Sequence, residues 1–205
     1  VKHNVTSDLI LDLTLNTDFA QVEADDERIN LSRFSLFFPE KRDFFQERAN
    51  LFTYRLPGGP ERLFQSRRIG IIQGQPTPIL GGARLTGRLG GWEVGLIEMQ
   101  TARATIDTVG RPSENFGVLR LKRPVLDRGS YVGGMVTSRT DFDGRHNLVA
   151  AADADLRLWA DYFAGLQLAQ STEPGADAAR SLLGAVVVQR RLRRGWSFGS
   201  SFRHT

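Results

Sequence analysis

The chain of 205 residues carries a formal net charge of +4 and has a pI near 9.9, and its length suits one large domain or two small ones. It contains no cysteine, which excludes disulfides, thiol catalysis and cysteine-ligated metal centres. Arginines supply almost all of the positive charge and are scattered through every segment, an arrangement that argues against nucleic acid as a partner.

Polar and apolar residues alternate with a period of two along most of the chain, which predicts β-strands rather than helices. Between Leu9 and Leu15, for example, every second residue is leucine, while Asp12 and Thr14 face the other way. No apolar run approaches the roughly 20 residues that a membrane helix needs. We predict strands, in chain order, at about 5–23, 28–38, 44–55, 79–88, 92–101, 115–123, 130–140, 146–158, 161–170, 180–191 and 195–205.

The predicted connections alternate between short and long. Short turns fall at 89–91, 126–129, 160–161 and 193–195, and longer polar loops fall at 56–78, 103–114, 141–145 and 171–179. Outer-membrane barrels have short turns on the periplasmic side, long loops outside, and strands of about 9–11 residues. The sequence therefore predicts an all-β fold, an antiparallel up-and-down meander of about 11 strands whose connections are typical of part of a transmembrane β-barrel; the choice of a barrel over a soluble sheet rests largely on the family resemblance described below.

An odd number of strands does not suit a single-chain bacterial barrel, which closes with an even number. An open sheet edge in lipid would leave backbone N–H and C=O groups without partners. We therefore expect residues 1–205 to form one domain, the N-terminal portion of a longer barrel whose C-terminal strands are missing. A soluble β-sandwich, which buries its apolar face against a second sheet, is left open by the alternation alone.

The stretch from Asn16 to Glu47 combines aromatic residues with acids, bases and a proline in an order that no ordinary helix or core strand needs. Together with Ser66–Gly70 and Gly82–Arg88, it resembles an uncharacterised family of bacterial outer-membrane β-barrels that follow a periplasmic carbohydrate-binding (family 9-like) domain. The resemblance implies a location in the outer membrane of a Gram-negative bacterium. It also implies two partners, the outer-membrane lipid and the chain's own periplasmic carbohydrate-binding-like domain, which would precede residue 1.

The centre of this stretch is predicted to be a tight periplasmic turn between two strands, because Pro39 cannot donate to a strand ladder. Its phenylalanines would form an aromatic girdle at the membrane interface, and its charged residues would pair locally. A docking surface for the periplasmic domain, or a plug that points inward, is the alternative. The motif consists of Phe37, Phe38, Pro39, Glu40, Lys41, Arg42, Phe44 and Phe45.

A second candidate site is a ladder of basic side chains inside the lumen, which would favour a polar or anionic solute. Its basic members are Arg67, Arg68, Arg84, Arg88, Arg120, Lys122 and Arg139. The acidic residues predicted to line the same lumen are Asp12, Asp153 and Asp155. The alternative is that these arginines form cross-strand salt bridges with the acids and with Glu93, and have no selectivity role.

Three further features carry weaker signals. The acidic residues between Asp18 and Glu27 could hold Ca²⁺ or form a solvated loop that pairs with neighbouring arginines. The three histidines lie far apart, so no metal site is expected, and nothing indicates a cofactor. Glu93 and Glu98 fall on opposite faces of their strand, which predicts a bulge near Ile97.

The sequence thus predicts a protein that is not an enzyme and that passes or captures a polar solute in a porin-like manner. A link to saccharides comes only from the neighbouring domain that the resemblance implies. One alternative is a structural barrel with a plugged lumen that anchors the carbohydrate-binding domain. The other is a soluble β-module or a fragment of a hydrolase.

Overall fold

The computed structural model describes residues 1–17, 40–54, 62–72, 75–106, 109–126, 129–159, 161–174, 182–190 and 198–204. Most of these residues belong to ten strands. They are β1 (Lys2–Asn4), β2 (Leu9–Thr17), β5 (Ile79–Leu89), β6 (Trp92–Thr101), β9 (Glu114–Pro124), β10 (Tyr131–Asp141), β11 (His146–Trp159), β12 (Tyr162–Thr172), β13 (Leu182–Arg190) and β14 (Phe198–His204).

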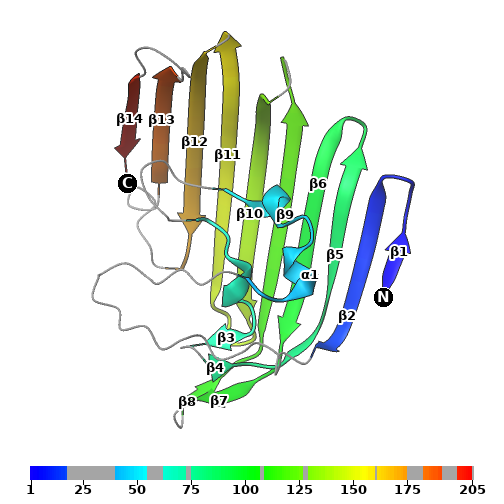
Figure 1. Ribbon diagram of the computed structural model, residues 1–205. Coiled ribbons are helices and arrows are strands. Elements are labelled where there is room, and N and C mark those ends of the chain that lie inside the picture. The colour runs from blue at the N-terminus through cyan, green and yellow to red at the C-terminus, as the bar shows by residue number, and fades with distance from the viewer. Residues whose placement is uncertain are drawn as a thin grey trace.

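The ten strands form one antiparallel sheet in the order β1-β2-β5-β6-β9-β10-β11-β12-β13-β14, so each strand pairs with its neighbours along this series (Figure 1). The strands β1 and β14 lie at opposite ends and do not pair with each other, which leaves the sheet unclosed. The predicted all-β antiparallel meander is therefore confirmed. From residue 79 onward, each predicted strand is present with ends shifted by at most a few residues.

The strand predicted at 44–55 does not form. Its residues instead make the short helix α1 (Asp43–Gln46) and the 3₁₀ turn η1 (Ala49–Phe52), and a second 3₁₀ turn, η2, covers Ser66–Arg68. Arg48, which separates α1 from η1, has a left-handed backbone with a φ of 53°, a conformation that no strand contains. The prediction at 28–38 lies outside the described residues.

Two small hairpins interrupt connections that were predicted to be loops. Strands β3 (Ile71–Ile72) and β4 (Gln75–Pro76) pair before β5, and strands β7 (Ala104–Ile106) and β8 (Val109–Arg111) pair between β6 and β9. No helix among the described residues is long and apolar enough to cross a membrane.

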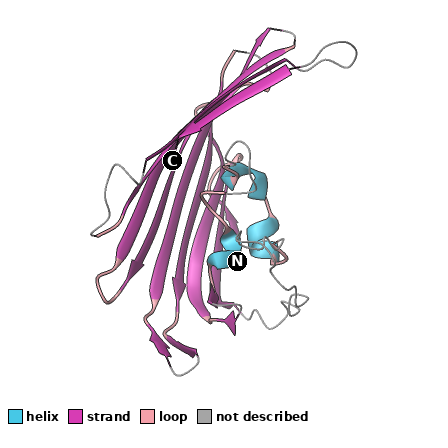
Figure 2. Ribbon diagram, turned by 90° about the vertical axis from the view of Figure 1, so that its left-hand side faces the viewer, coloured by secondary structure: helices cyan, strands magenta, loops and turns pink. Residues whose placement is uncertain are grey.

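The helical turns all lie on one side of the sheet, which we call the inner face (Figure 2). We call the described residues 40–54 and 62–72 the docked segment, because their apolar side chains pack against this face. The core is formed by buried side chains from both parts. The segment contributes Phe45, Leu51, Phe52, Tyr54 and Ile69, and the sheet contributes Ile79, Ile97, Met99, Val118 and Met135.

The opposite side, the outer face, is apolar and exposed. Strand alternation places there Leu13, Leu96, Leu119, Val136, Leu148, Leu166, Leu168, Val186, Val188 and Phe202, each more than a third exposed. Glu98 also lies on this face, next to Gly117 and Ser138 of the neighbouring strands. The bulge predicted near Ile97 is absent, since the pairing of β6 with β5 and with β9 runs unbroken past this residue.

Aromatic residues gather on the outer face where the short turns join the strands. The ring centroids of Trp159 and Tyr162 are 6.0 Å apart, and those of Tyr162 and Phe198 are 6.4 Å apart. The guanidinium of Arg190 lies 5.5 Å from the centroid of the Tyr162 ring. On the other half of the sheet, Arg123 lies at the same distance from Trp92.

The fold predicts a strong effect of substituting Gly95, whose missing side chain leaves room for η1. A Cβ at this position would lie 2.7 Å from Cζ of Phe52 and 2.9 Å from Cδ2 of Leu51. We expect Gly95→Ala to reduce the free energy of unfolding by about 1–3 kcal/mol, because the overlap forces the docked segment off the sheet.

Denaturant titration and the rate of tryptic cleavage after Lys41 or Arg48 would measure this effect. The matched control is Gly134→Ala on the outer face, where the nearest atom would lie 3.5 Å from the new Cβ. Equal cleavage rates and stabilities of the two variants would contradict the role assigned to Gly95.

Candidate functional site on the inner face

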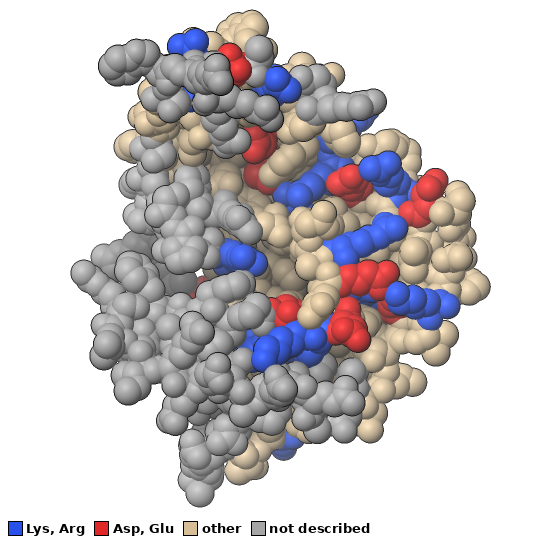
Figure 3. Space-filling view, viewed as in Figure 1, with Lys and Arg blue, Asp and Glu red and all other residues tan. Residues whose placement is uncertain are grey.

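Basic and acidic side chains lie next to one another on the inner face of the sheet (Figure 3). The strand register brings Asp12 opposite Arg84 and Arg88 opposite Glu93. All predicted lumen residues that belong to strands share this face, namely Asp12, Arg84, Arg88, Arg120, Lys122, Arg139, Asp153 and Asp155. Arg67 and Arg68 lie in η2 of the docked segment.

Arg84 joins the docked segment to the sheet and is 1% exposed. Its Nη2 lies 2.5 Å from Oδ2 of Asp12 and 2.9 Å from Oε2 of Glu47. Its Nη1 donates to the carbonyl oxygens of Phe44, within helix α1, and of Glu47, directly after it. Cations at a helix C-terminus satisfy carbonyl groups that have no partner within the helix. One guanidinium therefore ties β2, β5 and α1 together.

Arg120 forms a second buried ion pair, with Asp153. The two groups meet through parallel hydrogen bonds of 2.6 Å each, and Tyr131 also donates to Oδ2 of Asp153 at 3.1 Å. Such bidentate pairs have the most favourable geometry for an arginine and a carboxylate. Arg120 is fully buried, so the charge of Asp153 is needed to compensate it.

Tyr54 of the docked segment covers this pair. Its ring lies under the guanidinium of Arg120, 5.6 Å from it, and its hydroxyl lies 2.9 Å from the carbonyl oxygen of Ala152 and 3.0 Å from that of Leu168. Burial, together with the negative charge of Asp153, raises the pKa of Tyr54 above its usual value. The hydroxyl therefore remains protonated and acts as a donor that anchors the segment to β11 and β12.

The two described parts of the docked segment are joined by Arg42 and Glu40. Arg42 Nε and Nη2 each lie 2.7 Å from a carboxylate oxygen of Glu40, and Arg42 also donates to the carbonyl oxygens of Ser66 and Ile69. Burial opposes the ionisation of Glu40, but the hydrogen bonds and positive charge of Arg42 outweigh it, so the pKa of Glu40 is lowered. Residues 40–46 and 66–69 thus form one unit.

The described half of the predicted turn motif does not form a turn between neighbouring strands. Residues 40–45 belong to the connection from β2 to β5, whose ends pair as Thr17 with Ile79, and Ile79 also pairs with Thr101 at the start of a long loop. Phe45 is buried in the core, and Phe44 packs beside Arg84, so neither contributes to a membrane girdle. Lys41 is exposed.

The remaining members of that motif, Phe37, Phe38 and Pro39, lie outside the described residues, as do the acidic residues from Asp18 to Glu27. The described half packs on the inner face of the sheet, and its interpretation as a docking surface or an inward plug stays a prediction. The physical reason is that Phe45 and Arg42 gain more burial and more hydrogen bonds on the inner face than a rim turn offers.

Most of the predicted basic ladder is paired with acids. Besides the two buried pairs, Arg88 lies 3.3 Å from Glu93, and Arg139 lies 2.5 Å from Glu114. Lys122 lies with its amino group 3.5 Å from the carbonyl oxygen of Asn50 and 4.9 Å from the ring of Tyr131. Asp155 lies opposite Tyr131 in the register. A selectivity role for these residues stays a prediction.

A cleft of about 540 Å³ lies between the docked segment and strands β9 to β11, and we call it the inner cleft. The segment contributes Phe64, Gln65 and Arg68 to its lining, and the sheet contributes Phe116, Arg139 and Asn147. It continues at the long-loop end into a second hollow of about 190 Å³, with which it shares Glu114, Arg139, Asn147 and Glu173.

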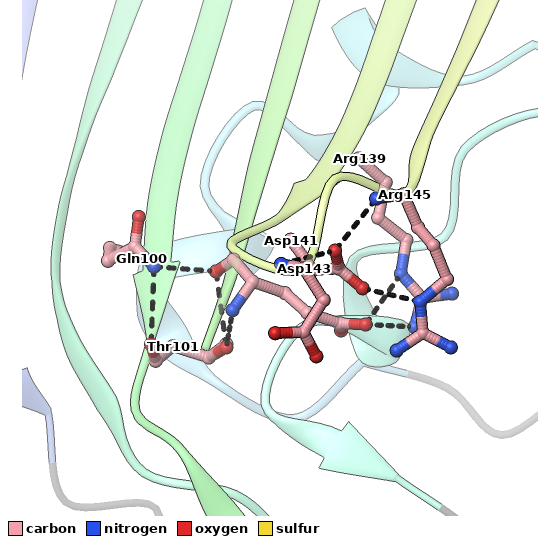
Figure 4. A network of polar contacts seen from close by, with 7 residues as sticks. Gln100, Thr101, Arg139, Asp141, Asp143 and Arg145 are labelled. Carbon is pink, nitrogen blue, oxygen red and sulfur yellow. Dashed lines mark hydrogen bonds and ion pairs between the residues drawn. The ribbon is translucent and has the colours of Figure 1, made fainter. Parts of the chain in front are cut away.

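A hydrogen-bond network fixes the mouth of the inner cleft (Figure 4). Thr101 Oγ1 accepts from the backbone N–H of Glu114 at 3.0 Å and lies 3.1 Å from its carbonyl oxygen. Gln100 donates to the same carbonyl oxygen at 3.1 Å. On the other side, Arg145 Nε lies 2.7 Å from Oδ2 of Asp141. The acids Glu114 and Asp141 are thereby held in place.

Sequence reasoning missed Glu114, Asp141 and Tyr54 as site residues. Glu114 and Asp141 were assigned to loops, although Glu114 continues the alternation of Phe116, Val118 and Arg120 and could have been placed on their face. No pattern in the sequence indicates that Tyr54 reaches the sheet. Among the described residues, no group of acidic or histidine side chains is arranged to hold a metal ion.

Comparison with known proteins adds one match. The model of a domain of unknown function, DUF5916, matches residues 1–78, which include β1, β2 and the docked segment. No curated protein and no solved structure matches the chain. Residues 1–78 are therefore similar to an uncharacterised domain, and this match carries no activity, substrate or location.

The site predicts that Arg84 is far more important for stability than Arg88. Arg84→Met leaves Asp12 buried without its partner, so we expect a loss of about 3–5 kcal/mol in the free energy of unfolding. Arg88→Met removes an exposed pair and should cost at most about 1 kcal/mol.

Urea titration of the two variants in detergent micelles measures the difference. The double variant Arg84→Met/Asp12→Leu should recover part of the loss, because it removes the unpaired carboxylate as well. A similar cost for Arg84→Met and Arg88→Met would show that the buried guanidinium does not hold the segment.

Proposed function

We propose that this chain is the N-terminal portion of a β-barrel in the outer membrane of a Gram-negative bacterium, and that the barrel passes or captures a polar solute. The observation that carries the proposal is the contrast between the two faces of the sheet. Exposed apolar side chains run across the outer face from β2 to β14, and charged side chains gather on the inner face. Lipid can surround an exposed apolar face, and the water in a lumen can hydrate a charged face.

A water-soluble protein would not be expected to leave the outer face exposed. Contiguous apolar patches on soluble monomers rarely exceed a few hundred Å². A β-sandwich covers such a face with a second sheet, but the helical turns of the described residues lie on the inner side of this sheet (Figure 2). The soluble reading is therefore less well supported than the membrane reading.

The aromatic residues at the short-turn end support the same proposal. Trp and Tyr are enriched where a membrane protein crosses from hydrocarbon to headgroups, because their rings are apolar and their polar atoms reach water. Trp159, Tyr162 and Trp92 lie on the outer face at this level, with Arg190 and Arg123 beside them. By the usual orientation of barrels, this end would face the periplasm and the long loops would face outward.

The free edges of β1 and β14 require further strands in a membrane, since unpaired backbone groups cost several kcal/mol each in lipid. We propose that additional strands of the same protein close the barrel and that a periplasmic carbohydrate-binding-like domain precedes it. The preference for a saccharide-related solute rests on that domain alone.

A second candidate function is a structural barrel that anchors the periplasmic domain and has a plugged lumen. The observation that favours it is the docked segment, which buries Arg84, Arg120 and the core of the inner face. An enzymatic role has no comparable support in the site.

Fractionation of host cells, followed by single-channel recording of the purified complete protein, tests both candidates. Recovery in the outer-membrane pellet, with protease cleavage of intact cells within 103–114 or 171–179, supports the barrel and its orientation. A measurable conductance in planar bilayers supports passage, and its absence supports the plugged barrel. Recovery in the soluble fraction would contradict the membrane proposal.

The proposal also predicts opposite outcomes for two adjacent valines of β13. Val186 is on the outer face and Val187 on the inner face. Val186→Arg should destabilise the protein in phosphatidylcholine vesicles by about 2–4 kcal/mol, because it places a charge in hydrocarbon. Val187→Arg should have a much smaller effect, since its side chain enters the lumen. Equal effects in a vesicle-based denaturant titration would argue against a lipid-facing outer face.

A further inference from the structure

We propose that the inner cleft binds an uncharged, polyhydroxylated solute rather than an anion. The proposal rests on the proposed function, because it takes the inner face to line a hydrated lumen. It narrows that function to one chemical class of solute and assigns the discrimination to Glu114 and Arg139.

The charges of the cleft cancel. The described residues that line the cleft and its mouth include three arginines, Arg68, Arg139 and Arg145, and three acids, Glu114, Asp141 and Glu173. Arg139 is paired with Glu114, and Arg145 is paired with Asp141. At these two pairs an anion would have to displace a carboxylate from its arginine, and a cation would have to displace an arginine. The two other charged residues of the lining, Arg68 and Glu173, are one of each sign, so neither sign of charge is favoured overall.

The ion pair at the mouth retains unused hydrogen-bonding capacity. Arg139 uses Nε and Nη2 on the same oxygen, Oε1 of Glu114, at 3.2 and 2.5 Å. This leaves Nη1 of Arg139 as a donor and Oε2 of Glu114 as an acceptor for a ligand. A hydroxyl group both donates and accepts, so neighbouring hydroxyls on one carbon chain match this adjacent donor and acceptor without any net charge.

The backbone of Glu114 is held in place before a solute arrives. Both backbone polar groups of Glu114 are bonded to Thr101, and Gln100 adds a bond to the carbonyl group (Figure 4). The guanidinium of Arg139 lies 5.6 Å from the centroid of the Phe116 ring, which supports it from below. Preorganised polar groups bind more tightly because little freedom is lost on binding.

The floor of the cleft suits the carbon skeleton of such a solute. Phe64 of the docked segment and Phe116 of β9 both line it, as does Asn147, whose amide also donates to Ser171. The cleft volume of about 540 Å³ falls within the range of about 300–1,000 Å³ that is usual for small-molecule sites. Apolar walls with a few placed polar groups are the common form of such sites.

The inference is tested by comparing the uptake of an uncharged and an anionic solute that have the same number of carbon atoms. The complete protein is reconstituted into liposomes, and the entry of radiolabelled sorbitol and of radiolabelled gluconate is followed at equal concentrations. We expect sorbitol to enter several-fold faster than gluconate. Gluconate entry as fast as sorbitol entry overturns this inference and leaves passage intact. Entry of neither solute, with folded protein in the vesicles, overturns the proposed passage and this inference with it.

Two variants test whether Glu114 determines the preference for sorbitol over gluconate. Glu114→Gln removes the carboxylate that neutralises Arg139 and should shift the sorbitol-to-gluconate ratio toward gluconate several-fold, because the exposed guanidinium can then bind the carboxylate of gluconate. The matched control Glu98→Gln makes the same change on the outer face and should leave the ratio unchanged. An equal shift in both variants overturns the assignment to the cleft. If Glu114→Gln does not fold, Arg139→Gln should shift the ratio in the opposite direction, and a shift toward gluconate would contradict the inference.

Discussion

The inner face can be covered by protein only because its buried arginines are neutralised. Arg84 and Arg120 are almost completely removed from solvent, and an unpaired guanidinium there would cost several kcal/mol. Asp12 supplies the opposite charge for Arg84 from the neighbouring strand β2, and Asp153 supplies it for Arg120 from β11, two strands away. Glu47 adds a further negative charge from the docked segment. With these charges satisfied, the apolar side chains of the segment can pack between them and form the core.

The same ion pairs explain why charged side chains and a hydrophobic core occur together on the inner face of the sheet. Phe52 and Leu51 sit over Gly95, while Arg120 and Lys122 flank them on the next strand. The outer face needs little charge compensation, because few of its side chains are polar. A strand that alternates without interruption is sufficient to separate the two environments.

Alternation was also the reason that much of the fold could be predicted from the sequence. From Ile79 to His204 the strands depend on contacts with sequence neighbours, so local pattern and turn residues determine them. The segment around Phe45 contains short apolar runs without regular alternation, and its structure depends on Arg84 and Gly95, which lie far away in the chain. Sequence pattern cannot distinguish a strand from helical turns in such short apolar runs. The faces of Arg84, Arg120 and Asp153 could be predicted, whereas the docking of Tyr54 over them could not.

The long connection between β2 and β5 has a consequence for the order of folding. Leu89 and Trp92, which close the β5–β6 hairpin, are 3 positions apart, whereas Thr17 and Ile79 are 62 positions apart (79 − 17). Contacts between distant positions form slowly, because the entropy of closing the loop must be overcome first. We therefore expect strands β5 to β14 to assemble early and to present Arg84 and Gly95 as the surface on which the docked segment packs. The docked segment then packs on this surface, and β1 and β2 add to the sheet last.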